Sequence, residues 1–392
     1  MNNPAALPYG RQWIDDDDIA AVVAVLQSDY ITQGPVIAAF EQGICAVTGA
    51  SFAVAVNSGT SALHIACRAA GVGVGDEVIT SANTFLASAN CVAYCGARPV
   101  FADIDAETYC INPDDLARKI TERTKAIIPV HFAGQSCDMQ AIAEIAREAG
   151  RRFGHKIWII EDASHTLGSR YQDRVIGSCQ YSDMAVLSFH PVKHITTGEG
   201  GAVLTNDPAV NEQLGLLRSH GMTKDPKVLS QQPGPWYYEQ VELGYNYRIT
   251  DIQCALGLSQ LKKLPMFLER RRAIVERYNA AFGMLDMVRI PAQAPDRESF
   301  FHLYVLLFDF ERIGKSRSQV MGELKDRGVL SQVHYIPVHL QPYYQRTFGT
   351  RAGDCPVAEW YYERCLSLPL FPRMTDEDVD RVINAVREVI TL

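Results

Sequence analysis

The feature that most constrains the fold is a series of short apolar runs separated by segments with helical periodicity. Two of the helical segments are residues 61–70 and 138–150. Continuous runs rich in Val and Ile are typical of strands buried on both faces, as in parallel sheets covered by helices. The apolar runs lie near residues 53–56, 77–80, 99–102, 126–130, 157–160, 184–189 and 202–204. We therefore predict an α/β fold with a seven-stranded, mostly parallel sheet, whose ligands bind outside the carboxyl ends of the strands.

The pattern changes near residue 265. Alternating strands and helices of a smaller unit follow. The elements predicted there are helices at 250–263 and 267–282, strands at 303–308 and 330–334, and a closing helix at 375–390. We predict a large domain over residues 1–265 and a smaller C-terminal α+β domain over residues 266–392.

Composition excludes several classes of partner. The 392-residue chain is 47% hydrophobic and carries a formal net charge of -8, which disfavours nucleic-acid and anionic-membrane partners. It has no run of 18 apolar residues, and residues 1–18 lack a signal pattern. The ten cysteines include no C-x-x-C pair, so we predict no metal site. We expect a cytoplasmic protein with no membrane or nucleic-acid partner.

A lysine lies at the centre of the segment Ser188–Gly201. The apolar run 184–189 predicts a buried strand that Pro191 ends, and Lys193 follows in the turn. An amine that reacts with carbonyls needs a partly desolvated position, because a solvated ammonium is not a nucleophile. We interpret Lys193 as a lysine that forms a Schiff base. Taken alone, a solvated lysine in a loop is the commoner arrangement.

The first strand runs into the sequence Asn57-Ser58-Gly59-Thr60-Ser61 and then a helix. Hydroxyl groups and free backbone N–H groups at a helix N-terminus can hold a phosphate. The alternative is an ordinary N-cap by Ser58 or Thr60.

Two other strand ends carry groups of different chemistry. Asp162 ends the strand at 157–160, and His165 follows three residues later. A carboxylate there can stabilise a protonated heteroaromatic nitrogen, or it can be only a helix N-cap. Phe85, after the second strand, offers an aromatic face for stacking, although taken alone it would be assigned to the core.

These groups together match one cofactor. A phosphate site, a carboxylate for a ring nitrogen, an aromatic plate and a Schiff-base lysine are what pyridoxal 5′-phosphate requires. We therefore predict that the chain binds pyridoxal 5′-phosphate.

Four motifs in this order resemble the DegT-type nucleotide-sugar aminotransferases. They are Ser-Phe-His-Pro-Val-Lys-x4-Gly-Glu-Gly-Gly around Lys193, Glu-Asp-Ala-Ser-His at 161–165, Asn-Ser-Gly-Thr-Ser at 57–61 and Gly-Tyr-Asn-Tyr-Arg at 244–248. The resemblance covers nearly the whole chain. It implies the fold-type I, aspartate aminotransferase-like architecture and a homodimer whose two active sites lie at the subunit interface.

The resemblance also implies roles for individual residues. Lys193 would be the Schiff-base residue and the catalytic base, and Asp162 would hold the pyridinium nitrogen. His165 is expected at the 3′-oxygen of the ring, and Phe85 on one ring face. The residues expected to bind the phosphate are Gly59, Thr60 and Ser188, together with Asn246 from the second subunit.

Within that family the chain resembles the pseudaminic-acid UDP-4-keto-sugar C4 aminotransferases. The matches include residues 218–222, 255–263 and 332–337, whereas the chain beyond Gln341 matches less firmly. The resemblance implies a substrate-binding segment at residues 1–35. The expected sugar-nucleotide contacts are Tyr9, Asp29, Tyr30, Ile31, Thr32, His190, His334, Tyr335, Ile336 and Pro337. His190 can alternatively pack against the strand end.

The reaction implied is a ping-pong transamination. L-Glutamate gives up its amino group and leaves as 2-oxoglutarate, and C4 of UDP-2-acetamido-2,6-dideoxy-β-L-arabino-hex-4-ulose is then aminated. A UDP-4-keto-pentose aminotransferase or a GDP-perosamine-type aminotransferase would share nearly all the cofactor residues. A sugar 3-dehydratase is disfavoured, because a histidine is expected there in place of Lys193. A regulator that binds pyridoxal 5′-phosphate without turnover is the alternative from another class.

Overall fold

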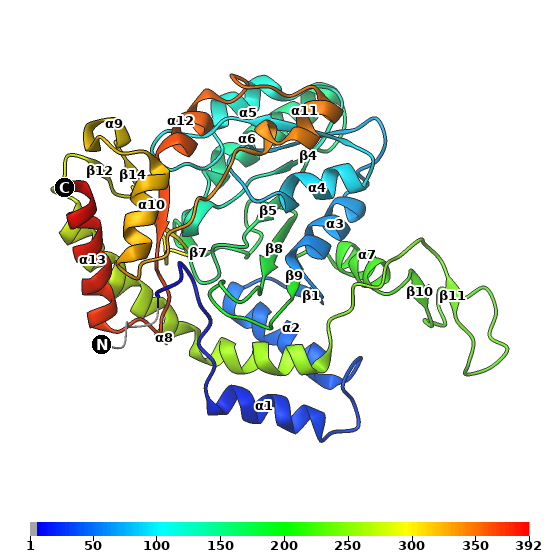
Figure 1. Ribbon diagram of the computed structural model, residues 1–392. Helices are drawn as coiled ribbons and strands as arrows, with labels where there is room; N and C mark the ends of the chain where they lie inside the picture. The colour runs from blue at the N-terminus through cyan, green and yellow to red at the C-terminus, as the bar shows by residue number, and fades with distance from the viewer. Residues whose placement is uncertain (1–5, 392) are drawn as a thin grey trace.

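A computed structural model describes residues 6–391 of the chain, and a seven-stranded sheet lies at its centre (Figure 1). The strand order is β1-β9-β8-β5-β4-β2-β3. Only β9 is antiparallel to its neighbours β1 and β8, and all other pairs of neighbours are parallel. The strands are β1 (Phe52–Val56), β2 (Glu77–Ser81), β3 (Arg98–Ala102), β4 (Thr124–Ile128), β5 (Trp158–Asp162), β8 (Met184–Ser188) and β9 (Gly201–Thr205). The predicted mostly parallel sheet is confirmed.

Successive residues of each strand pack into hydrophobic cores on opposite faces of the sheet, as the two-residue period of a strand requires. In β1, Ala53 and Ala55 belong to one core, and Val54 and Val56 belong to the other. One face is covered by α3 (Gly59–Ala69), α4 (Ala87–Tyr94) and α7 (Pro208–Arg218). The other is covered by α2 (Pro35–Thr48), α5 (Pro113–Lys119), α6 (Met139–Phe153) and α8 (Asp251–Phe282).

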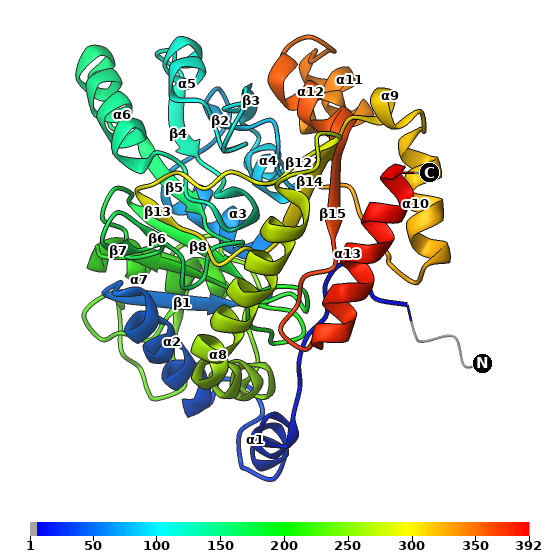
Figure 2. The same cartoon turned by 90° about the vertical axis from the view of Figure 1, so that its left-hand side faces the viewer.

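A second sheet with its own core lies beside the large one (Figure 2). Its strands β12 (Val288–Arg289), β14 (Tyr304–Phe308) and β15 (Cys365–Leu368) are antiparallel. The helices of this part of the chain are α9 (Phe310–Ile313), α10 (Arg317–Asp326), α11 (Pro342–Phe348), α12 (Pro356–Arg364) and α13 (Asp376–Thr391). The strand predicted at 330–334 was wrong, because this segment forms only an isolated bridge, between Gln332 and Ser367.

Helix α8 joins the two cores. Its first half packs against α1 (Asp16–Leu26) and α2, and its second half contributes Ile274 and Tyr278 to the core of the small sheet. The prediction of two helices separated near Pro265 was wrong, because α8 continues through this proline. A proline removes one helical hydrogen bond, and burial of both halves of α8 holds the helix together. The division between residues 265 and 266 therefore falls inside a helix, and it stays a prediction.

Three peripheral features complete the fold. The chain before α1 runs along the small sheet, where Leu7 exchanges backbone hydrogen bonds with Gly328 and Leu330 and Tyr9 accepts one from Leu370. A hairpin of β10 (Met222–Thr223) and β11 (Glu239–Gln240) projects from the body (Figure 1). A further small sheet consists of β6 (Arg170–Tyr171), β7 (Arg174–Val175) and β13 (Arg297–Glu298). Among residues 6–391, no helix is long and apolar enough to cross a membrane.

Candidate active site

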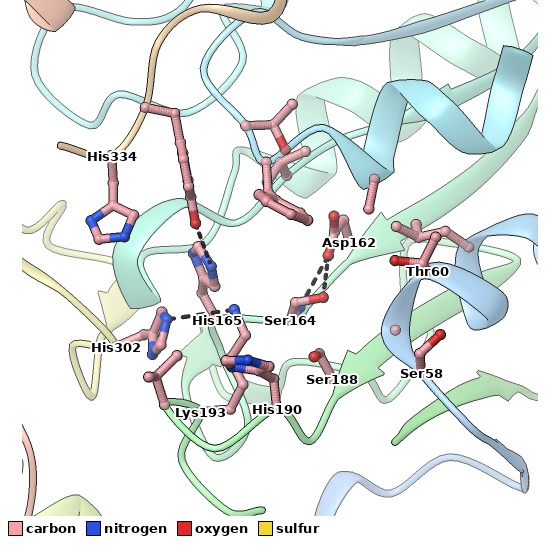
Figure 3. A pocket seen from close by; sticks show the side chains of 18 of the residues that line it. Ser58, Thr60, Asp162, Ser164, His165, Ser188, His190, Lys193, His302 and His334 are labelled. Carbon is pink, nitrogen blue, oxygen red and sulfur yellow. Dashed lines mark hydrogen bonds between the residues drawn. The ribbon is translucent and has the colours of Figure 1, made fainter. Parts of the chain in front are cut away.

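A cavity of about 440 Å³ lies at the carboxyl ends of β1, β5 and β8 (Figure 3). Parallel strands bring their carboxyl ends to one edge of the sheet, so residues far apart in the sequence meet there. The lining residues are Tyr9, Ser58, Gly59, Thr60, Leu63, Thr84, Phe85, Ala87, Val130, Asp162, Ser164, His165, Ser188, His190, Val192, Lys193, Glu199, His302, His334 and Tyr335. The volume is within the range of small-molecule and cofactor sites.

Lys193 reaches this cavity from the turn after β8. Its backbone N–H donates to the carbonyl of His190 at 2.9 Å, which closes the turn that Pro191 begins. Burial lowers the pKa of Lys193 from 10.5 to about 8, although the negative charge of Asp162 acts in the opposite direction. A lysine with this pKa is uncharged in about a tenth of molecules at pH 7, far more than an ordinary lysine, so it can act as a nucleophile or a base.

Asp162 is the last residue of β5 and is buried. Ser88 Oγ donates to one of its carboxylate oxygens at 2.6 Å. Ser164 donates to the other oxygen through its Oγ at 2.6 Å and its backbone N–H at 3.2 Å. These contacts fix the carboxylate plane at the edge of the cavity.

His165 follows Asp162 by three residues, and a hydrogen bond to its ring shows which ring nitrogen carries the hydrogen. The backbone N–H of Ala133 donates to His165 Nδ1 at 3.3 Å, so Nδ1 carries no hydrogen and Nε2 does. His165 Nε2 also lies 3.4 Å from the Tyr335 hydroxyl. Burial holds the pKa of His165 well below its ordinary value, with a further contribution from Lys193. His165 is therefore a neutral hydrogen-bond donor at this end of the cavity.

The N-terminus of α3 forms the opposite end of the cavity. Ser58 is the N-cap of this helix, and its side chain accepts from the Ser61 N–H at 3.1 Å. The first turn of a helix offers N–H groups that have no partner within the helix. A Cβ atom on Gly59 would lie 3.0 Å from Ser188 Cβ and 3.2 Å from Ser188 Oγ. The Ser188 hydroxyl and the first N–H groups of α3 therefore converge where an anion would bind.

Aromatic side chains form the remaining wall. Phe85 is 57% exposed, and its ring centroid lies 6.2 Å from that of Tyr335. Tyr9 packs on His334 at 4.9 Å between ring centroids, and His334 Nδ1 lies 2.8 Å from Ser367 Oγ. Burial lowers the pKa of His334 to about 3, so this imidazole is neutral. The aromatic wall separates the cavity from the small sheet.

Some residues expected at the site lie outside this cavity. Asn246 pairs instead with Ser219 in an isolated bridge. Thr32 pairs in the same way with Thr250. The side chains of Tyr30 and Ile31, which precede it, are 58% and 51% exposed. The predicted contacts that do not line the cavity of their own chain are Asp29, Tyr30, Ile31, Thr32, Asn246, Ile336 and Pro337.

The lining residues that were not assigned to the site from the sequence include Ser164, Glu199 and His302. Ser164 and Glu199 lie inside motifs that were recognised, so their positions at strand ends were a usable signal. His302 precedes β14 and lies more than a hundred residues after Lys193. No spacing in the sequence connects it with the other residues of the site. Its Nε2 atom nevertheless lies 3.5 Å from Lys193 Nζ.

The residues present fit pyridoxal 5′-phosphate. The N-terminus of α3 and Ser188 match its phosphate, Asp162 matches its ring nitrogen, and Lys193 matches its aldehyde. In residues 6–391, no group of three or more His, Cys, Asp or Glu side chains is arranged to hold a metal ion.

Comparisons with known proteins agree with this chemistry. Residues 12–387 match the model of the DegT/DnrJ/EryC1/StrS aminotransferase family. The chain is 44% identical over 385 residues to the spore coat polysaccharide biosynthesis protein SpsC of Bacillus subtilis, covering 98% of this chain and 97% of SpsC. It is 42% identical over 391 residues to the uncharacterized protein MJ1066 of Methanocaldococcus jannaschii, covering 100% and 99% of the two chains.

Solved structures share the whole fold. Helicobacter pylori PseC, described as an aminotransferase involved in the biosynthesis of pseudaminic acid, matches with a TM-score of 0.89 and 32% identity over 98% of this chain and 99% of PseC. The putative sugar aminotransferase Spr1654 of Streptococcus pneumoniae, in its PMP form, matches with a TM-score of 0.90 and 34% identity over 98% and 99% of the chains. The chain therefore belongs to the DegT/DnrJ/EryC1/StrS aminotransferase family, and it is a sugar aminotransferase that uses pyridoxal 5′-phosphate.

Proposed function

We propose that this aminotransferase moves the amino group of L-glutamate to C4 of a UDP-4-keto-6-deoxy-N-acetylhexosamine. The proposed product is UDP-4-amino-4,6-dideoxy-N-acetyl-β-L-altrosamine, an intermediate of pseudaminic acid biosynthesis. The observation that carries the transamination is the convergence of Lys193, Asp162 and the N-terminus of α3 in one cavity. The choice of sugar rests on the similarity to PseC and on the motifs shared with that group. A cytoplasmic location stays a prediction.

The cavity suggests a role for each residue that binds the cofactor. When bound, pyridoxal 5′-phosphate supplies an electron-withdrawing ring and an aldehyde that carries the amino group between donor and acceptor. We assign Asp162 to the ring nitrogen and His165, through Nε2–H, to the 3′-oxygen. Phe85 covers one face of the ring. The phosphate contacts from this chain are Gly59, Thr60 and Ser188.

Lys193 performs two tasks in this proposal. It anchors the cofactor covalently, and as a free amine it moves a proton at the reacting carbon. Both tasks require the uncharged amine, which the burial of Lys193 favours at its pKa of about 8. The Asp162 carboxylate accepts hydrogen bonds from two serine hydroxyls, so the positive charge on the ring nitrogen has a partner in a fixed position.

The sugar nucleotide has its own side of the cavity. Tyr9 and Tyr335 line the wall next to the small sheet, and His190 lies beside Lys193. Burial lowers the pKa of His190 from 6.5, although the charge of Glu199 acts in the opposite direction. A neutral imidazole can donate to a sugar hydroxyl or a keto oxygen. We therefore propose Tyr9, His190, His334 and Tyr335 as sugar contacts.

We propose a homodimer in which each subunit completes the other's site. Large apolar side chains are exposed near the projecting hairpin, including Trp236 at 70% and Leu243 at 70%. Exposed apolar surface of this kind marks an interaction site. Asn246 follows this region and lies outside the cavity of its own chain, which fits a contact with the phosphate in a second copy. The segment 29–32 and the pair Ile336 and Pro337 are proposed as substrate contacts in the same assembly.

Two experiments test the function. Product NMR after incubation with L-glutamate and the enzymatically made UDP-4-keto-6-deoxy sugar is expected to show a new 4-amino group, and parallel incubations with UDP-4-keto-pentose and a GDP-4-keto sugar identify the preferred substrate. Faster turnover of either alternative would overturn the choice of sugar. The Lys193→Ala variant is expected to bind the cofactor and to lose transfer. Turnover near the parent level in this variant, without an added amine, would refute the role of Lys193.

A further inference from the structure

His302 is buried, with 4% of its surface exposed, and its Nε2 atom lies 3.5 Å from Lys193 Nζ (Figure 3). This separation is longer than the usual hydrogen bond of an N–H donor, about 2.7–3.2 Å, so the contact is a long one. The His302 ring also packs against that of His165, with 4.3 Å between ring centroids. His302 therefore contacts the reacting amine from the side of the small sheet.

The backbone of His302 is held by a buried arginine. Arg271 in α8 is 1% exposed, and its guanidinium donates to the carbonyls of Phe301, His302 and Leu370 at 3.1–3.3 Å. Phe301 has a φ of 45°, a left-handed conformation that a bulky residue rarely adopts. Conformations of this kind persist where the surrounding structure enforces them. The position of His302 is thus fixed by α8 and by the chain before α13.

The second ring nitrogen of His302 indicates which nitrogen carries the hydrogen. Nδ1 is buried and has no hydrogen-bond partner among residues 6–391. A buried N–H group without a partner is rarer and costlier than a buried lone pair without one. The hydrogen of the neutral ring therefore belongs on Nε2, the atom that faces Lys193 Nζ. In that tautomer, Nε2–H can donate only to an amine that has a free lone pair.

We propose that His302 is a further catalytic residue, which donates a hydrogen bond from Nε2–H to Lys193 Nζ and so stabilises the uncharged amine. This inference rests on the proposed role of Lys193. An ammonium would place two N–H groups against each other, and so the contact disfavours protonation of the lysine. The same hydrogen bond holds Nζ at the cavity wall whenever Lys193 is not bonded to the cofactor.

The groups that surround this pair leave His302 neutral. Burial keeps the pKa values of His165, His194 and His302 well below the ordinary histidine value. The positive charges of Lys193 and Arg271 lower that of His302 further. The titratable groups that face the pair from the neighbouring elements are Asp162, His165, His190, His194, Glu199, Arg271 and His334.

The first test reads the tautomer in the full-length, cofactor-free protein. The protein is labelled with ¹⁵N-histidine, and the ring resonances of His302 are assigned by their absence in His302→Gln. We expect a hydrogen on Nε2, a bare Nδ1, and a change in the Nε2 resonance when Lys193 is replaced by Ala. A hydrogen on Nδ1, or a resonance that is the same in Lys193→Ala, would overturn the proposal.

The second test measures the pKa of Lys193 by competitive acetylation at a series of pH values, with mass spectrometry of the Lys193 peptide. An apolar side chain at position 302 dehydrates the amine, which by itself lowers the lysine pKa. Lys193 is already desolvated by its surroundings, so this lowering is small. Loss of the hydrogen bond acts in the opposite direction, and His302→Leu is expected to raise the pKa of Lys193 by up to about 0.7 unit, the equivalent of about 1 kcal/mol. An unchanged or lower pKa contradicts the proposal.

A matched control uses a histidine outside the cavity. The ring of His155 bonds the carbonyl of Thr124, and His155→Leu is expected to leave the pKa of Lys193 unchanged. If His302→Leu does not fold, as judged by circular dichroism, the tautomer experiment decides alone, since it needs no apolar variant. Neither measurement uses a sugar substrate, so a wrong substrate assignment would leave both results intact.

Discussion

The replacement of Gly201 by Ala tests whether the backbone at the start of α3 is the phosphate site. Gly201 begins β9 and pairs with Val56 and Ser188. A Cβ atom on Gly201 would lie 2.6 Å from the carbonyl oxygen of Ser58 and 2.7 Å from the backbone nitrogen of Gly59. Ordinary contacts begin at 3.4 Å, so the backbone of residues 58–59 must move by about 0.7–0.8 Å. Overpacking of this kind costs about 1–3 kcal/mol.

This displacement acts on the atoms proposed to bind the phosphate. If half of this cost falls on the bound state, the affinity for pyridoxal 5′-phosphate decreases about two- to twelvefold, since 1.4 kcal/mol corresponds to a factor of ten. Titration of the cofactor-free variant, followed by absorbance, measures the dissociation constant. The control is Gly215→Ala in α7, where a Cβ atom meets open space and helix propensity improves by about 1 kcal/mol. A Gly201→Ala protein that binds the cofactor as tightly as the parent would refute this phosphate site.

Three other results are expected. Asp162→Asn keeps the size of the side chain but removes its charge and leaves only one oxygen to accept from the serines. Steady-state kinetics are expected to show a loss in kcat/KM of about a hundredfold or more. A loss below threefold would contradict the role of Asp162. Arg271→Met removes the guanidinium that donates to three carbonyls, so urea unfolding should show a free energy of unfolding that is lower by about 3 kcal/mol. An unchanged free energy of unfolding would contradict this role of Arg271. Burial lowers the pKa of Lys193 to about 8. The rate at which the cofactor-free protein binds the cofactor covalently, measured by stopped-flow absorbance, should therefore decrease about tenfold for each pH unit below this value. Above this value the rate should level off. A rate that keeps rising well above pH 8 would show that the amine is not desolvated.

The large sheet could be predicted because each strand is a continuous apolar run, and its buried residues face cores on both sides. The same reasoning placed Lys193, Asp162 and Gly59 together, since each follows a strand whose carboxyl end lies at one edge of the sheet. Local sequence was sufficient there, because parallel strands place their carboxyl ends at the same edge of the sheet.

Other features depend on tertiary packing that the sequence does not display. Helix α8 continues through Pro265 because both of its halves are buried, one against α1 and α2 and the other in the small core. His302 reaches Lys193 because Arg271 holds the chain before β14, and no spacing in the sequence links these residues. The segment 29–32 was expected to contact the substrate, yet its position beside the start of α8 depends on how α1 and α2 pack.

The central claim is that Lys193 carries the cofactor in the cavity described. Borohydride reduction of the holoenzyme, followed by proteolysis and mass spectrometry of the peptides, locates the lysine to which pyridoxal 5′-phosphate is attached. The account predicts one modified peptide, which contains Lys193, and loss of this modification when L-glutamate is added before reduction. Attachment to a different lysine, or a modification that glutamate does not remove, would contradict it.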